Sequence, residues 1–147
     1  MRTILGITMA VVIGAASLAG PALAEPASTL SSGDRASIRS VVEQQLAAFQ
    51  ADDGARAFGF ASPDIQRMFQ SPDRFMAMVR QGYRPVYRAR EVQFLDLIDL
   101  GDQLAQRVLL VGPDGQVVTA YYAMERQADG TWRIDGCVLE QAPDLAI

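Results

Sequence analysis

The sequence predicts a single α+β domain, in which helices come first and a four-stranded antiparallel sheet follows. Apolar residues recur at helical spacing up to about residue 90, and they alternate with polar residues beyond Glu91. Three short turn signals, GD, GPDG and ADG, divide the alternating half into strands. We therefore expect one domain over residues 34–141, followed by a C-terminal tail over residues 142–147.

The first helix is expected to begin near Asp34, where apolar residues start to recur at intervals of three and four positions. Ser32 or Asp34 caps its start, and the segment ADDG ends it. Either Asp52 or Asp53 then caps a second, shorter helix through GARAFGFA.

The tripeptide SPD occurs twice, at Ser62 and at Ser71. Each copy supplies a serine cap, a proline at the first helical position and an acid in the first turn. The second copy opens a helix whose apolar face includes Phe75 and Val79, and Gly82 is placed to end it.

The alternating half predicts strands at about 91–100, 103–112, 116–127 and 130–140. Because successive side chains point to opposite faces of a sheet, the more apolar set in each strand identifies its buried face. The inward set is Val92, Phe94, Asp96, Ile98 and Leu100 in the first strand, Val118, Ala120, Tyr122 and Met124 in the third, and Trp132, Ile134, Gly136 and Val138 in the fourth. The second strand is apolar on both sides, so its sequence does not orient it.

The other face of the sheet is predicted to be apolar as well. It would include Leu95, Leu97, Leu109, Val111, Val117, Tyr121, Cys137 and Leu139. A soluble domain does not leave an apolar surface of this size in water. We therefore expect a homodimer that joins two copies through this face.

The first 24 residues predict a cleavable signal peptide. Arg2 precedes an uncharged apolar run, Gly20 and Pro21 break that run, and small residues lead up to a cleavage point after Ala24. The alternative is an uncleaved membrane anchor, because the apolar stretch is almost long enough to cross a bilayer. Cleavage would leave a disordered lead-in over residues 25–33 and a periplasmic or secreted domain without a membrane segment.

The composition excludes several classes of function. The net charge is −4 and all 13 basic residues are arginine, so this acidic chain is not expected to bind nucleic acid. The chain has no histidine, which removes Ser-His and Cys-His nucleophiles and leaves no Cys/His zinc cluster. We expect neither a metal nor a cofactor. The single cysteine, Cys137, is either a buried thiol or half of an intermolecular disulfide.

Four segments, FASPDIQRMF, SPDRFMAMV, YRPVYRAREVQF and WRIDGC, resemble an uncharacterised family of exported proteobacterial proteins over residues 35–141. The order of the elements and the closing DGTWRIDGCVLE resemble the nuclear transport factor 2-like (cystatin-like) folds. That resemblance implies a curved sheet wrapped round helices as a cone, often with a cavity and often in a dimer. It implies no particular activity.

Asp96 and Tyr122 are the candidate catalytic residues, because strand parity places both of them inside the cone. A buried carboxylate opposite a hydroxyl donor is suited to removing a proton next to a carbonyl, as a small lyase or isomerase does. Two other interpretations of Asp96 stay open. A β-bulge would turn it to solvent, and an arginine would hold it in a salt bridge.

The candidate ligand-binding set is Arg88, Arg90, Asp96, Tyr122, Met124 and Trp132. Ordinary core packing is the alternative for the last three of these residues. Arg88 and Arg90 belong to the basic stretch RQGYRPVYRAR, in which Pro85 favours an extended backbone. Either a bulge sends the two arginines to solvent or to salt bridges, or they point into the cone and select an anionic ligand.

The sequence thus favours a non-catalytic module that binds a small molecule or another protein. The alternatives are a lyase or isomerase that uses Asp96 and Tyr122, and a structural protein whose cone is filled by its own side chains.

Overall fold

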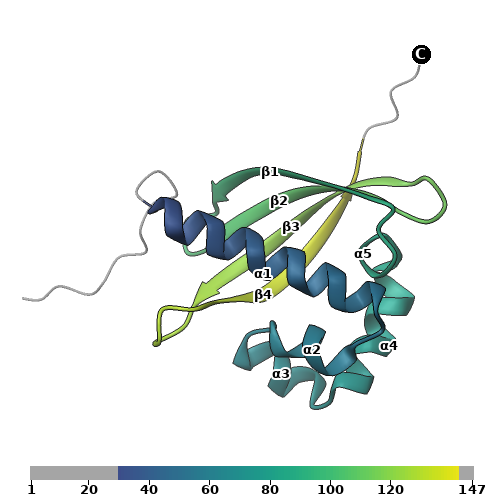
Figure 1. Cartoon of the computed structure of the whole chain (residues 1–147), viewed down its shortest axis with the longest axis horizontal. Helices are drawn as coiled ribbons and strands as arrows, with labels where there is room; N and C mark the ends of the chain where they lie inside the picture. Colours follow the sequence, from purple (N-terminus) through teal and green to yellow (C-terminus); the bar gives the residue numbers. More distant parts are fainter. Residues whose placement is uncertain (1–29, 143–147) are drawn as a thin grey trace, which may run out of the picture.

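The computed structural model describes residues 30–142, and the predicted signal peptide lies outside them. The predicted α+β class is confirmed: N-terminal helices pack on a four-stranded antiparallel sheet (Figure 1). The helices are α1 (Ser32–Gln50), α2 (Gly54–Gly59), α3 (Pro63–Phe69), α4 (Pro72–Gly82) and the single turn α5 (Arg84–Tyr87). In Figure 1, α1 crosses one face of the sheet, and α2, α3 and α4 lie beside the edge formed by β4.

The strands of the sheet lie side by side in the same order as in the chain, β1-β2-β3-β4. Its strands are β1 (Glu91–Asp99), β2 (Leu104–Val111), β3 (Val117–Arg126) and β4 (Trp132–Gln141). The three connections contain Gly101, Gly115 and Gly130, each with a positive φ that other residues rarely adopt. The turn signals in the sequence therefore lie where the strands reverse.

α1 begins slightly earlier than predicted. Its cap is Ser31, whose hydroxyl oxygen accepts a hydrogen bond of 3.0 Å from the amide of Asp34. The two expected caps, Ser32 and Asp34, lie within the helix. Since Leu30 is also buried in the core, the predicted disordered lead-in does not extend to residue 33.

The other predicted caps are confirmed. Asp53, Ser62 and Ser71 each accept a hydrogen bond from the amide three residues further on, at the starts of α2, α3 and α4. By contrast, the extended backbone expected around Pro85 is wrong, because Pro85 lies in the first turn of α5.

The core lies between α1 and the inner face of the sheet. Ile38, Val42 and Phe49 of α1 are fully buried there. The side chains of the two central strands alternate between the two faces of the sheet, as in a regular sheet. Their inward residues are Leu104, Gln106, Val108 and Leu110 in β2, and Val118, Ala120, Tyr122 and Met124 in β3, and all of them are buried. The predicted orientation of β3 is confirmed, and pairing with β3 orients β2.

A β-bulge in β1 reverses the predicted parity of that strand. Phe94 pairs with Val108 and Leu97 pairs with Gln106, so Leu95 and Asp96 together face one residue of β2. Beyond the bulge Leu97 turns inward, and Ile98 pairs with the outward Ala105. The Gln106 side chain donates a hydrogen bond of 2.9 Å to the carbonyl of Leu95 within the bulge.

A second bulge lies in β4 at Asp135. Ala123 pairs with Gly136 and Met124 pairs with Ile134, which leaves Asp135 as the extra residue. Trp132 and Ile134 face inward as predicted. After the bulge, Cys137 pairs with the inward Tyr122, and Cys137 and Leu139 pack against the core. The predictions that Val138 faces inward and that Cys137 and Leu139 face outward are therefore wrong, and Val138 is 66% exposed.

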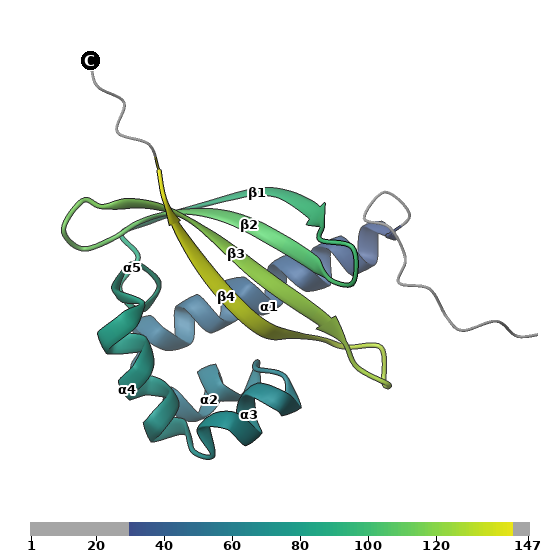
Figure 2. The same ribbon diagram turned by 180° about the vertical axis from the view of Figure 1, so that it is seen from behind.

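The outer face of the sheet carries no helix among the described residues (Figure 2). Leu109, Val111, Val117 and Tyr121 lie on it as predicted. No helix among residues 30–142 has the length and apolar character needed to cross a membrane.

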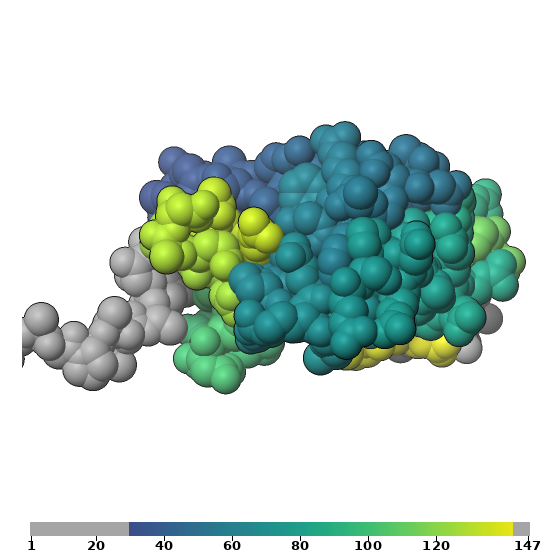
Figure 3. All heavy atoms as spheres, turned by 90° about the horizontal axis from the view of Figure 1, so that it is seen from below, coloured from purple at the N-terminus to yellow at the C-terminus, as the bar shows by residue number. Residues whose placement is uncertain are grey.

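The helices α2, α3 and α4 are fixed to the edge of the sheet by a backbone bridge. The amide of Ile134 donates to the carbonyl of Phe60, and the amide of Ser62 donates to the carbonyl of Ile134, each at 2.8 Å. Seen from below, the teal residues of α3 and α4 lie between the blue residues of α1 and α2 and the yellow residues of β4 (Figure 3).

Candidate functional site

A cavity of about 490 Å³ lies where α3 and α4 meet the inner side of β3 and β4. Its wall is mainly apolar, and none of the described residues that line it carries a formal charge. The volume falls within the range of small-molecule pockets, about 300–1,000 Å³. The cavity is therefore the strongest candidate for a functional site.

Aromatic rings form the helical wall of the cavity. The ring of Phe75 on α4 lies at centroid distances of 6.1 Å from Phe49, 5.4 Å from Phe58 and 5.7 Å from Phe69. Phe49, Phe69 and Phe75 line the cavity directly. Tilted and edge-on ring pairs of this kind contribute about 0.5–1.5 kcal/mol each beyond the area that they bury, and they stabilise the helical wall.

Three polar side chains also line the cavity, and two of them already have partners within the protein. The amide of Gln45 donates to the carbonyl of Ala57 at 3.1 Å. The hydroxyl of Tyr83 donates to the carbonyl of Cys137 at 3.0 Å. The hydroxyl of Tyr122 is buried and has no hydrogen-bond partner in the described part of the chain.

The ionisable groups of the cavity wall are held neutral. Burial raises the pKa of Tyr122 well above its ordinary value, and burial also raises the pKa of Tyr83. Burial raises the pKa of the Cys137 thiol to about 12. At neutral pH the described part of the wall therefore offers hydroxyl, thiol and amide groups and no charge.

The mouth of the cavity is marked by two exposed apolar residues. Met68 on α3 is 69% exposed and Val138 on β4 is 66% exposed, whereas Tyr122 is only 1% exposed. Among the residues that line the cavity, Tyr122 is therefore covered from solvent, whereas Met68 and Val138 are open to it.

Asp96 does not share this cavity. The β1 bulge turns its carboxylate outward, where it is 60% exposed and forms a salt bridge of 2.6 Å with Arg107. It borders a shallow depression of about 280 Å³ between α1 and β1. Both alternatives to the buried carboxylate, the bulge and the salt bridge, are therefore present, and the predicted inward orientation is wrong.

Arg88 binds the C-terminal end of α1 and does not line the cavity. Its guanidinium donates to the carbonyl of Phe49 at 2.5 Å, forms a salt bridge of 2.8 Å with Asp52 and lies 3.9 Å from the centroid of the Tyr87 ring. Arg90 is exposed to solvent. Neither arginine lines the cavity, so the structure gives no support to an anionic ligand there.

Met124 and Trp132 belong to the core. Both are buried, and the indole nitrogen of Trp132 donates to Asp34 at 3.2 Å. Neither lines the main cavity. Of the six predicted ligand-binding residues, Tyr122 alone lies in its wall.

Sequence reasoning missed the other polar residues of the wall. The sequence assigned no functional role to Tyr83, and it placed Cys137 on the outer face because parity was counted through the bulge at Asp135. Gly136, a glycine inside the strand and next to Asp135, was the available signal for that bulge.

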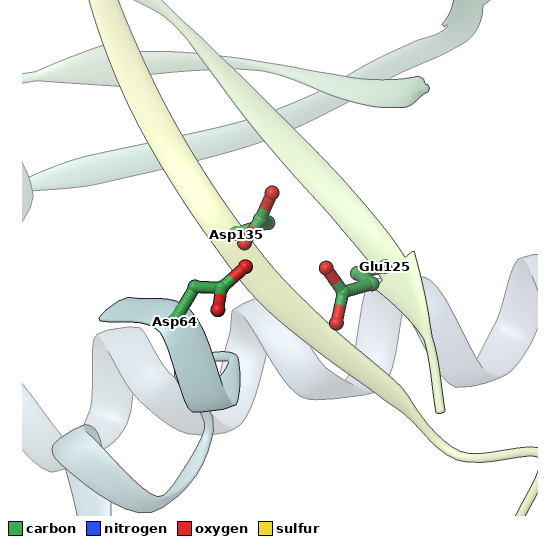
Figure 4. A group of neighbouring side chains, drawn as sticks. All are labelled: Asp64, Glu125 and Asp135. Carbon is green, nitrogen blue, oxygen red and sulfur yellow. The ribbon is translucent and has the colours of Figure 1, made fainter. Parts of the chain in front are cut away.

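A group of three carboxylates lies near the bulge in β4. Asp64 of α3, Glu125 of β3 and Asp135 of β4 bring one oxygen each within 4.8 Å of one another (Figure 4). Both oxygens of Asp135 already accept hydrogen bonds, from Ser62 at 2.6 Å and from Gln103 at 2.8 Å. Hydrogen bonds within the protein therefore explain the position of Asp135. We do not assign the three carboxylates as a metal site.

Comparisons with known proteins agree with an uncharacterised family. Searches of the curated proteins and of the solved structures found no significant match. A family model described as a domain of unknown function, DUF4864, matches residues 31–147, which include every helix and strand described above. The chain therefore belongs to the DUF4864 family of domains of unknown function.

Proposed function

We propose that this chain is a non-catalytic module that binds a small, mainly apolar molecule in the cavity between α3, α4 and β4. The observation that carries the proposal is Tyr122, which lines the cavity and whose buried hydroxyl has no partner in the described residues. Buried polar groups are nearly always hydrogen-bonded in native proteins, and those that are not call for an explanation. A bound molecule in the cavity would supply the missing partner.

A binding role suits this wall better than catalysis. General acid–base catalysis needs a group whose pKa lies near the working pH. Burial raises the pKa values of Tyr83, Tyr122 and Cys137, so none of the three is a base at neutral pH. Asp96, the base of the alternative lyase or isomerase, lies outside the cavity.

The proposal is tested by filling the cavity at Cys137. The purified protein should increase the fluorescence of Nile red, an uncharged apolar dye, and Cys137→Phe should abolish that increase because the ring occupies the cavity. Cys137→Val, which differs little in volume from the wild type, is the matched control and should retain binding. Circular dichroism and urea unfolding would verify that both variants fold. Dye binding by a folded Cys137→Phe variant equal to the wild type would contradict the proposal.

We further propose that the domain is of the nuclear transport factor 2-like (cystatin-like) type. The support is its order of elements, with helices before a four-stranded meander, and a cavity between the helices and the inner face of the sheet. An experimental structure that superposes poorly on proteins of that fold would contradict this assignment.

Export and dimerisation stay predictions. The signal peptide predicts a mature chain that begins at Glu25, which mass spectrometry of the periplasmic or secreted protein would verify. The outer face that a homodimer would use is still apolar, although Leu97, Cys137 and Leu139 do not lie on it and Val138 does. Light scattering should give the mass of two copies at micromolar concentration, and a monomer would contradict the prediction.

A further inference from the structure

The depth and chemistry of the cavity limit what kind of molecule it accepts, if it binds one as proposed above. None of the described residues in the wall is charged. An ion that entered would lose its hydration without gaining a partner of opposite charge, which costs several kcal/mol. The part of a bound molecule that lies inside the cavity is therefore uncharged.

Among the polar groups of the described wall, one buried hydroxyl lacks a hydrogen-bond partner. Gln45 donates to Ala57 and Tyr83 donates to Cys137, so both already have partners. The hydroxyl of Tyr122 is the buried side-chain group without a partner in residues 30–142. It is held neutral by burial and therefore keeps a hydrogen to donate.

The position of this hydroxyl sets the orientation of the bound molecule. Tyr122 is 1% exposed, and the phenylalanine rings of α1, α3 and α4 lie along the wall. Met68 and Val138, the most exposed large apolar residues described, lie at the mouth. A molecule whose polar atom reaches Tyr122 places its apolar body against the rings and against these two side chains.

We propose that the cavity binds an uncharged, mainly apolar molecule with a hydrogen-bond acceptor, such as a ketone, ester or ether oxygen, and that this acceptor enters first and binds the Tyr122 hydroxyl. The orientation is opposite to that of a fatty acid whose carboxylate stays at the mouth. The inference rests on the proposed binding function and adds the chemistry and the direction of the molecule.

Three naphthalene derivatives of similar size test this inference by displacement of Nile red. They are 2-acetonaphthone, which carries a carbonyl acceptor, 2-isopropylnaphthalene, which has no acceptor, and 2-naphthoate, which is an anion. We expect 2-naphthoate to bind at least about tenfold more weakly than the ketone. Equal binding of the anion and the ketone would overturn the inference of an uncharged ligand.

The ratio of ketone to hydrocarbon affinity is then compared between the wild type and Tyr122→Phe. Removal of the hydroxyl should lower this ratio about three- to tenfold, the range expected for one hydrogen bond. Tyr121→Phe is the matched control, because Tyr121 is the next residue of β3, lies on the outer face and donates to Glu140. It should leave the ratio unchanged, and an equal ratio in all three proteins would overturn the inference.

The infrared carbonyl stretch of bound 2-acetonaphthone gives a second measurement that needs no variant. A hydrogen bond from Tyr122 should lower its frequency relative to the same ketone in a hydrocarbon solvent, and an unshifted band would contradict the inference. If neither ketone nor hydrocarbon binds, the binding function itself is overturned and the inference with it. If both bind with the same affinity ratio in Tyr122→Phe as in the wild type, only the inference about Tyr122 fails.

Discussion

The two central strands and the two edge strands of this sheet follow different rules. β2 and β3 pair without interruption from Leu104 to Val111, and their side chains alternate between the two faces throughout. β1 and β4 each contain one bulge, at Leu95–Asp96 and at Asp135. A central strand is restrained by a partner on both sides, whereas an edge strand can accept an extra residue at the cost of one side of pairing.

The difference decides which residues form the cavity. The bulge in β1 removes Asp96 from the interior, and the bulge in β4 turns Cys137 inward beside Tyr122. The cavity wall therefore includes Cys137, and none of its described residues is charged. Alternation along a strand correctly predicts the face on which each side chain lies in the two central strands, and it fails in the two edge strands.

The largest effect should come from a direct comparison of one central residue with its partner at the edge. Leu110 of β2 is fully buried, and Val92 of β1, which pairs with it, is 44% exposed. Leu110→Ala should lower the free energy of unfolding by about 2–5 kcal/mol, because it leaves a cavity in the core. Val92→Ala should cost less than about 1 kcal/mol, measured by urea unfolding. Similar costs for both would mean that β1 is as well packed as β2.

The bulge in β4 is tested at Asp135. Asp135→Ala removes the acceptor of the buried Ser62 hydroxyl and should lower the free energy of unfolding by about 1–3 kcal/mol. Asp135→Asn keeps one acceptor oxygen for Ser62 and should cost clearly less. If Asp135→Ala is as stable as the wild type, relief of repulsion from Asp64 and Glu125 offsets the lost hydrogen bonds.

The inward position of Cys137 predicts a loss of stability at alkaline pH. The pKa of the thiol is about 12 in the folded protein, against an ordinary value of 9.0. Above pH 9 the unfolded chain loses this proton while the folded chain keeps it, so the free energy of unfolding falls as the pH rises towards 12. Urea unfolding should show a loss of about 1 kcal/mol between pH 9 and pH 10.

Cys137→Ala is the control for this prediction. Its free energy of unfolding should change less over the same interval, because Tyr83 and Tyr122, whose ordinary pKa is 10.0, begin to lose protons in the unfolded chain only towards pH 10. An equal alkaline loss in both proteins would show that Cys137 is not the responsible group.

The smallest effect is expected at the β1 bulge. Asp96 is 60% exposed and its salt bridge with Arg107 lies at the surface, where ion pairs contribute little. Asp96→Asn should shift the thermal unfolding midpoint by less than about 2 °C and leave Nile red binding unchanged. A loss of dye binding would mean that Asp96 contributes to the cavity, which would contradict its outward orientation at the bulge.

The local features of the fold could be predicted because short-range chemistry determines them. Serine and aspartate caps at Asp53, Ser62 and Ser71, and glycines at the three turns, act on backbone groups a few residues away. Even so, both predicted caps of α1, Ser32 and Asp34, are wrong, because Ser31 caps that helix.

The site could be predicted in part. Tyr122 was identified because β3 is central and its parity holds. Arg88 was not placed by its sequence, since the turn of α5 and the end of α1 together bring it to Phe49 and Asp52. Cys137 and Tyr83 entered the wall only through the β4 bulge and the position at which α4 ends.

By itself the sequence determined the α+β class, the order of the four strands and the inward face of β3, because periodicity and turn chemistry are local. The tertiary structure alone decided where the edge strands take an extra residue, which helix end receives Arg88 and where an apolar cavity remains. These features depend on contacts between residues far apart in the chain, and no spacing within one segment encodes them.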